Sequence, residues 1–380
     1  MFIYSLFVVL ILIIASCQSN EKEDANKNVK SSDSLLSNCA AELFIIAVNE
    51  QYTYITIKDP WSKTATLGTY LLVHKDSAVK DYFPKADYLI RTPVKSVAAL
   101  STTHIGFLAF LGMEQSITGV TDPFRVYNAN VRAGLKNGKV LNMGMSMTPS
   151  EENLLALSPD VIFKSGFTQV KQQDKQLLQS GLPVVYVCEW LENSPLARAE
   201  WIKVFAAFYN EIQKGDSLFE KVKSNYENIA ARISDEINRP KILAGYGFKG
   251  TWFMPGGRSY QAKLIEDAGG DYLWNTDTTF GSIPLGFETI LSVSQNADIW
   301  IGVEEDSFDQ LAANEKRLTL FEAYTERKIY NRNKAKTTEG ANDYWETAVV
   351  RPDLHLRDYC CIIHPELFND YQTVYYQVLK

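Results

Sequence analysis

Residues 194–237 read SPLARAEWIKVFAAFYNEIQKGDSLFEKVKSNYENIAARISDEI, and this stretch decides how the rest of the chain is organised. Ser194 followed by Pro195 predicts a helix start, because a serine side chain accepts a free backbone N–H and proline needs no N–H partner there. Apolar residues then recur at three- and four-residue spacing, which predicts one buried helix face. These residues are Trp201, Val204, Phe205, Phe208 and Ile212.

A second helical leg follows the first without an intervening proline. Gly215 predicts an interruption, and Ser217 with Glu220 matches a capping box, which predicts a new helix start. No proline occurs between Pro195 and Pro240. We therefore expect residues 215–237 to form one long, rigid connecting helix.

The segments on both sides of this run read strand–helix–strand, which is typical of parallel sheets covered by helices. Before it, we predict a β-hairpin over 43–57 and strands over 67–74, 94–100, 117–120, 140–143, 161–163 and 184–188. After it, we predict strands over 241–244 and 297–302 and helices over 260–268, 317–324 and 365–379. The fold class is α/β, with two Rossmann-like lobes (41–214 and 238–380) joined by the helix and a ligand cleft between them.

The first residues have the pattern of an export signal. An apolar run over 6–15 is too short to span a bilayer and suits a signal peptide, which we place at residues 1–16. The run ends in Ile14-Ala15-Ser16-Cys17, which resembles a bacterial lipobox and predicts lipidation of Cys17. Residues 17–40 are polar and predict a disordered tether.

Composition excludes some classes of function. The net charge of −7 and a pI near 5.3 argue against a nucleic-acid partner, which selects a basic surface. The five cysteines and four histidines show no metal-site spacing, so we predict no metal site and no cofactor.

Several stretches together resemble the periplasmic substrate-binding proteins of iron–siderophore, haem and cobalamin ABC importers. They are 97–112 with 119–122, 149–160, 194–226, and Gly302 with 342–345 and 351–353. The resemblance implies two lobes joined by one helix, a ligand held without covalent change, and delivery to an ABC permease dimer. It places one permease-docking glutamate on each lobe, Glu152 and Glu288. It also implies a monomer in the cell envelope of a diderm bacterium, attached to a membrane by its lipid and facing the periplasm.

We expect the ligand to be an iron–siderophore complex, with cobalamin or haem as alternatives for the same fold. An anionic chelate needs cationic groups in the cleft, and aromatic or methionine side chains suit its apolar parts. The predicted ligand-binding residues are Thr102, His104, Arg125, Met145, Met147, Trp190, Tyr246, Trp252, Arg258, Tyr260, Tyr344, Trp345 and Arg351.

Two patterns suggest other functions. Gly245, Gly247 and Gly250 match G-x-G-x-x-G, but Pro255-Gly256-Gly257 follows, whereas a dinucleotide site needs a helix to begin in that loop. Ser101, His104 and Asp122 offer a triad for a two-lobed transferase or hydrolase, although no G-x-S-x-G elbow is present. We expect a binding protein rather than an enzyme.

Overall fold

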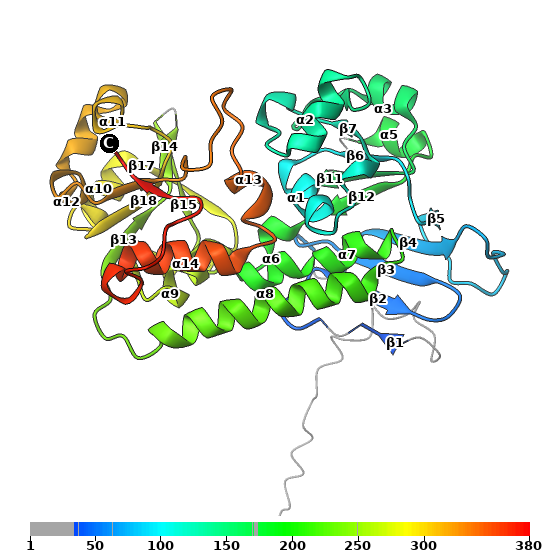
Figure 1. Ribbon diagram of the computed structural model, residues 1–380, viewed down its shortest axis with the longest axis horizontal. Coiled ribbons are helices and arrows are strands. Elements are labelled where there is room, and N and C mark those ends of the chain that lie inside the picture. The colour runs from blue at the N-terminus through cyan, green and yellow to red at the C-terminus, as the bar shows by residue number, and fades with distance from the viewer. Residues whose placement is uncertain (1–33, 37, 63, 169, 171–173, 249) are drawn as a thin grey trace, which may run out of the picture.

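The computed structural model describes residues 34–36, 38–62, 64–168, 170, 174–248 and 250–380. The predicted signal peptide, Cys17 and most of the predicted tether lie outside this part of the chain. Two α/β lobes stand side by side above one long helix, as Figure 1 shows. The predicted fold class is confirmed.

The N-terminal lobe is built on a five-stranded parallel sheet with the order β12-β11-β6-β7-β8. Its strands are β6 (Val97–Ala99), β7 (Ile117–Val120), β8 (Leu141–Asn142), β11 (Val161–Ser165) and β12 (Val184–Val187). The helices are α1 (Thr102–Phe110), α2 (Ala129–Lys136), α3 (Glu151–Leu157) and α5 (Lys175–Gln179). Strand β11 is buried at four of its five residues, as expected for a sheet covered on both faces.

A second sheet precedes this lobe and packs against it. It consists of β1 (Ser34–Leu35), β2 (Phe44–Val48), β3 (Thr53–Lys58), β4 (Thr66–His74) and β5 (Tyr88–Thr92), in that order. The predicted hairpin is confirmed, with Phe44 paired to Ile57. The buried Tyr70 hydroxyl donates to the Val184 carbonyl at 2.8 Å, which fixes this N-terminal sheet to the edge of the parallel sheet.

The C-terminal lobe has a five-stranded sheet with the order β16-β13-β18-β19-β20 and a three-stranded antiparallel sheet, β14-β15-β17. The strands are β13 (Lys241–Ala244), β14 (Tyr246–Phe248), β15 (Thr251–Pro255), β16 (Asp271–Tyr272), β17 (Ser282–Gly286), β18 (Ile299–Val303), β19 (Ile329–Asn331) and β20 (Gln377–Val378). The helices are α9 (Tyr260–Asp267), α10 (Phe287–Ser294), α11 (Phe308–Asn314), α12 (Glu322–Thr325), α13 (Tyr344–Thr347) and α14 (Pro352–Ile363).

The stretch 194–237 forms three helices, α6 (Pro195–Glu200), α7 (Ile202–Ala207) and α8 (Ile212–Ile233). The Ser194 side chain accepts the Ala197 N–H, so the predicted N-cap is confirmed. In α8, Phe219 belongs to the core of the N-terminal lobe and Tyr226 to that of the C-terminal lobe. This helix therefore joins the two lobes.

The predicted break at Gly215 is wrong. The chain turns before α8 instead, where Asn210 adopts a left-handed φ of 60°. Gly215 lies inside α8, and a Cβ atom there would lie 2.6 Å from that of Ala206, so the glycine allows α7 and α8 to pack closely. The Ser217 hydroxyl donates to the Gln213 carbonyl within the same helix and caps nothing.

The lobes also meet through α13, which lies between them in Figure 1. The Glu346 carboxylate, 2% exposed, accepts the backbone N–H groups of Tyr127 and Asn128 from the N-terminal lobe. A Cβ atom on Gly106 of α1 would lie 1.8 Å from the Glu346 carbonyl oxygen, so only glycine fits at this contact. Both α8 and α13 thus connect the lobes.

Two predictions at the chain ends are wrong. Residues 365–379 form no long helix, because the buried Asp358 carboxylate accepts the N–H groups of Val374, Tyr375 and Tyr376 and holds that segment in a bend before β20. The last part of the predicted tether is ordered. Ser34–Leu35 pairs with β2, and the N–H groups of residues 39–41 donate to the buried Glu200 carboxylate.

Candidate functional site

A cavity of about 320 Å³ lies between the two lobes, and we call it the interlobe cavity. Most of its lining comes from loops that leave β6, β7, β11 and β12 of the N-terminal lobe. The carboxyl ends of parallel strands meet at one edge of a sheet, and ligands of open α/β folds bind there. The lining residues are Ser101, Thr102, Thr103, Thr121, Asp122, Arg125, Ser146, Ser165, Phe167, Glu189, Trp190, Arg198, Tyr260 and Trp345.

Arg198 is the central charge of this cavity. It extends from α6, and its guanidinium carbon lies 3.9 Å from the centre of the Tyr260 ring, which belongs to the C-terminal lobe. Its Nη2 atom lies 3.6 Å from Glu189 Oε1, which is an ion pair and longer than a hydrogen bond. The cation is therefore held between a carboxylate and an aromatic face from opposite lobes.

Hydrogen-bonding capacity is left over at this centre. Among the described residues, Arg198 Nε and Glu189 Oε2 are buried and have no hydrogen-bond partner. Burial raises the pKa of Glu189, and the nearby Arg198 partly offsets that rise. Because a buried polar group without a partner costs free energy, such atoms beside a cavity indicate a place where a polar ligand supplies the missing bonds.

A second buried arginine stands behind the C-terminal wall. Arg332 follows β19 directly and donates to the Gly302 carbonyl. Its guanidinium lies 5.2 Å from the centre of the Tyr344 ring and 5.1 Å from that of Trp345. Trp345 itself lines the cavity and is 44% exposed. The wall is thus an aromatic surface with a positive charge beneath it.

Five of the predicted ligand-binding residues line the interlobe cavity: Thr102, Arg125, Trp190, Tyr260 and Trp345. They come from both lobes, from loops that are distant in sequence.

The prediction for His104 is wrong. Its side chain is fully buried among Phe163 and Phe205 and has no hydrogen-bond partner within the described residues. Burial lowers its pKa to about 3, so it is a neutral core residue. His104 makes no hydrogen bond to Ser101 or Asp122, so the alternative catalytic triad does not form.

Trp252 was also wrongly placed at the ligand. It is 2% exposed, stacks near Trp300 at 5.2 Å between ring centres, and donates to the Ala244 carbonyl. The glycines before it belong to the β14–β15 hairpin, in which Gly247 pairs with Trp252. No helix begins in that loop, so the dinucleotide interpretation is excluded there.

Six other candidates lie outside the interlobe cavity. Met145 and Met147 are exposed on a small β-turn beside Ser146, and Tyr344 packs beneath Trp345. The Tyr246 hydroxyl donates to Glu305 at 2.8 Å, and Arg351 pairs with Asp353 at 2.9 Å. Arg258 lines a different groove.

Sequence reasoning missed Arg198, Glu189, Phe167 and Arg332. For Arg332 a signal was present, because it directly follows the short run Ile329–Asn331, which forms β19 and pairs in parallel with β18. Arg198 lies in the first turns of a helix whose buried face had been identified, and nothing in the spacing indicated that its other face borders a cavity.

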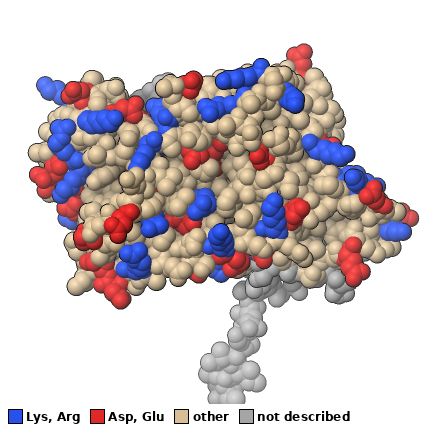
Figure 2. Space-filling view, in the orientation of Figure 1, with Lys and Arg blue, Asp and Glu red and all other residues tan. Residues whose placement is uncertain are grey.

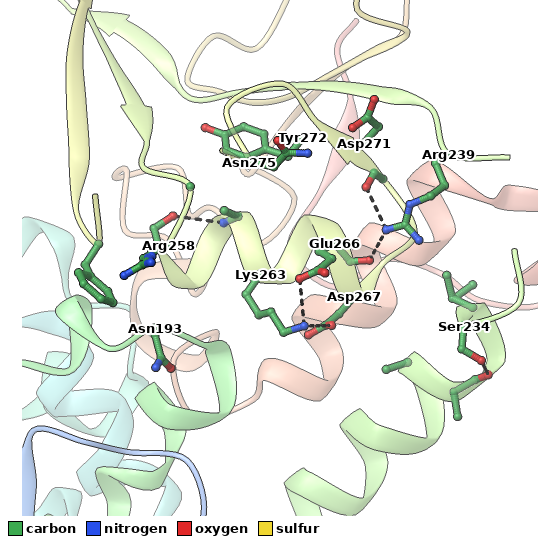
Figure 3. A pocket seen from close by; sticks show the side chains of 18 of the residues that line it. Asn193, Ser234, Arg239, Arg258, Lys263, Glu266, Asp267, Asp271, Tyr272 and Asn275 are labelled. Carbon is green, nitrogen blue, oxygen red and sulfur yellow. Dashed lines mark hydrogen bonds and ion pairs between the residues drawn. The ribbon is translucent and has the colours of Figure 1, made fainter. Parts of the chain in front are cut away.

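The groove that contains Arg258 is larger, about 1040 Å³, and lies between α8, α9 and the loop before β17. Figure 3 shows that two of its basic side chains, Lys263 and Arg239, bind other groups of the groove. Lys263 pairs with Glu266 and Asp267 at 3.0 and 2.8 Å, and Arg239 donates to the Glu266 and Gly270 carbonyls. Because Lys263 and Arg239 are satisfied within the protein in this way, we rank this groove below the interlobe cavity despite its volume.

The outer surface is mixed in charge. Basic and acidic side chains are interspersed over the face in Figure 2. Glu152 is exposed in the first turn of α3, and Glu288 is exposed on α10 and pairs with Arg317 at 2.8 Å. Within the described residues, no group of three histidine, cysteine or acidic side chains is placed to hold a metal. No helix of this part of the chain is long and apolar enough to cross a membrane.

Comparison with known proteins shows the same architecture. An uncharacterized lipoprotein of Methanocaldococcus jannaschii is 26% identical over 82% of this chain and 76% of its own length. The Ni(II)-bound Ceue structure from Helicobacter pylori has a TM-score of 0.57 at 19% identity and covers 77% of this chain and 91% of its own.

The vitamin B12 binding protein BtuF of Vibrio cholerae has a TM-score of 0.53 at 10% identity, with 73% of this chain and 99% of its own covered. At these identities the solved structures show the fold alone. The profile of the periplasmic binding protein family matches residues 97–334, which hold the parallel sheet of the N-terminal lobe, α8, much of the C-terminal lobe and most of the interlobe cavity. This chain therefore belongs to the periplasmic binding protein family, whose members bind solutes rather than transform them.

Proposed function

We propose that this protein is the lipid-anchored solute-binding component of an ABC importer, that it captures an iron–siderophore complex between its lobes, and that it delivers the complex to a permease dimer. The carrying observation is the pairing of Arg198 and Tyr260 across the interlobe cavity, with unpartnered polar atoms on Arg198 and Glu189. A guanidinium donates planar, charge-assisted hydrogen bonds to carboxylate or catecholate oxygens. The ferric chelate is cargo, and no resident cofactor is needed.

Tryptophan fluorescence tests this proposal, because Trp190 and Trp345 both line the cavity. The purified chain is titrated with ferric chelates, cyanocobalamin and haemin. Saturable quenching by a ferric chelate is the expected result. Quenching by cyanocobalamin or haemin alone would make cobalamin or haem the ligand in place of the iron–siderophore complex. No response to any of the three would contradict the proposal.

Permease docking is proposed for Glu152 and Glu288, which are exposed on different lobes (Figure 1). Two separated carboxylates orient a partner mainly through electrostatic complementarity. The double variant Glu152→Ala with Glu288→Ala is expected to keep its ligand affinity and to abolish uptake. Loss of ligand affinity in that variant would contradict the docking assignment.

Attachment through Cys17 is proposed from its lipobox-like context and from the relative named a lipoprotein. We place the protein as a monomer in the envelope of a diderm bacterium, facing the periplasm. Radiolabelled palmitate incorporation into the wild type and its loss in Cys17→Ala would test the anchor.

A further inference from the structure

The N-terminal sheet brings an aromatic residue to one end of the interlobe cavity. The chain between β3 and β4 turns tightly, with the Asp59 carboxylate accepting the Trp61 N–H and the Asp59 N–H donating to Ala65. Trp61 projects from this turn and is 39% exposed. The turn lies within residues 34–92, which precede the family match at residue 97.

Trp61 contacts the aromatic residues that line the cavity. Its ring centre lies 6.5 Å from that of Trp190, and Trp190 lies 5.7 Å from Phe167. Both Trp190 and Phe167 line the interlobe cavity. The three rings form a continuous row that leads from the cavity to the exposed surface.

Trp190 lies where the N-terminal lobe approaches the C-terminal lobe. Its indole N–H donates to the Gly166 carbonyl at 3.3 Å. Its Cζ3 atom lies 4.0 Å from where a Cβ atom on Gly281 of the C-terminal lobe would be. Gly166 is in turn confined by Cys188 and by Leu67 of the N-terminal sheet. The row therefore lies where the N-terminal sheet and both lobes meet.

We infer that Trp61, Trp190 and Phe167 form an aromatic wall that extends the ligand site, and that this wall selects chelates carrying planar aryl groups. This inference rests on the proposed function and names its substrate class. A cavity of about 320 Å³ is at the small end for ligand pockets, so a bulky chelate extends beyond it. Aromatic rings offer offset-stacked or edge-to-face contacts to an aryl group and little to an aliphatic carboxylate.

Two anionic probes separate the aryl contribution from the charge contribution. They are the ferric complex of 2,3-dihydroxybenzoate, which carries aryl groups, and ferric citrate, which carries none. Dissociation constants are measured by fluorescence for the full chain and for Trp61→Ala, Trp61→Leu and Trp61→Phe. Tyr82→Ala is the matched control, since Tyr82 is an exposed aromatic residue that precedes β5 of the same sheet.

The wild type is expected to bind the aryl complex more tightly than ferric citrate. Trp61→Ala and Trp61→Leu should weaken binding of the aryl complex about tenfold and change that of ferric citrate less than about twofold. Trp61→Phe should keep most of the affinity, and Tyr82→Ala should change neither constant. Trp61→Leu retains apolar bulk, so it answers the question even where Trp61→Ala unfolds.

Equal effects on both probes, or no effect on either, would overturn the aromatic wall and leave the proposed function standing. Tighter binding of ferric citrate by the wild type would do the same. Failure of the wild type to bind any ferric chelate would overturn the proposed function and the wall together.

Discussion

Arg198 is the residue on which the site depends, because its cation is buried between Glu189 and Tyr260 and still has an unpartnered Nε. Its neighbours hold the guanidinium plane in one orientation. A ligand oxygen that binds there gains a charge-assisted hydrogen bond from a donor that needs no reorganisation.

Replacing Arg198 by alanine should weaken binding of anionic ferric citrate roughly 10- to 100-fold, since a hydrogen bond to a charged group contributes about 1.5–3 kcal/mol. Arg198→Lys keeps the charge without the planar donors, so its affinity for ferric citrate should lie between those of the wild type and of Arg198→Ala. Fluorescence titration measures the constants. Arg258→Ala, in the larger groove, is the control, and an unchanged constant for Arg198→Ala would show that the arginine does not contact the ligand.

At the scale of elements, the parts of the fold that were predicted correctly carry local signals. Ser194 and Pro195 start α6, and the apolar runs at 117–120 and 241–244 are strands with those bounds. The parts that were wrong depend on distant partners. Residues 374–376 are helix-compatible in sequence, yet their N–H groups bind Asp358, which a local pattern cannot reveal.

The site was predicted only in part for the same reason. Trp190 lies just after a predicted strand and Tyr260 at a predicted helix start, and both were among the predicted residues. Arg198 borders the cavity only because of how α6 packs against α9. His104 sits in a strand-exit loop by sequence, but α1 begins at Thr102 and turns its side chain into the core. A helical period places a residue on a face, and only tertiary packing decides what that face meets.

Asp358 should therefore be essential for the C-terminal segment. Asp358→Ala removes the acceptor for three backbone N–H groups and the Tyr371 hydroxyl, and we expect a loss of about 2–5 kcal/mol in the free energy of unfolding. Urea unfolding measures the loss, and limited proteolysis should show earlier cleavage after residue 364. The exposed Asp370→Asn is the control; equal stability of the two variants would contradict this account.

At the scale of the whole molecule, the connections through α8 and α13 limit how far the lobes move apart. Helix α8 contributes side chains to the cores of both lobes, and Glu346 of α13 accepts a hydrogen bond from the N-terminal lobe. We expect the radius of gyration from small-angle scattering to change little when ligand binds. Glu346→Ala, which removes the two carboxylate hydrogen bonds to the N-terminal lobe, should widen the unliganded state, and a large contraction of the wild type would contradict the prediction.

Buried ionisable groups make stability depend on pH in opposite directions. Burial raises the pKa of Glu192 and of Glu346 to about 7, so folding takes up protons and lowering the pH favours the folded state until the unfolded pKa near 4.5 is passed. Burial lowers the pKa of His104 and of His355 to about 3, so lowering the pH below about 6.5 disfavours the folded state.

Single variants should separate the two effects. Between pH 6 and 5, each group contributes up to about 1.4 kcal/mol per pH unit. Compared with the wild type, His104→Phe should gain stability as the pH falls and Glu346→Gln should lose it. Urea unfolding at pH 8, 6 and 5 measures both, and parallel pH profiles for all three proteins would contradict the assignment.

The binding of the N-terminal segment to α6 has a mechanical consequence. The N–H groups of residues 39–41 are held by Glu200, and those of residues 42 and 43 by Glu192. Lys203 in turn forms an ion pair with Glu200 at 2.9 Å. A load applied at Ser34 meets the pairing of β1 with β2 first and then the Glu200 carboxylate on α6, two residues from Arg198. The point that bears the load and the point that borders the interlobe cavity therefore share one turn of helix.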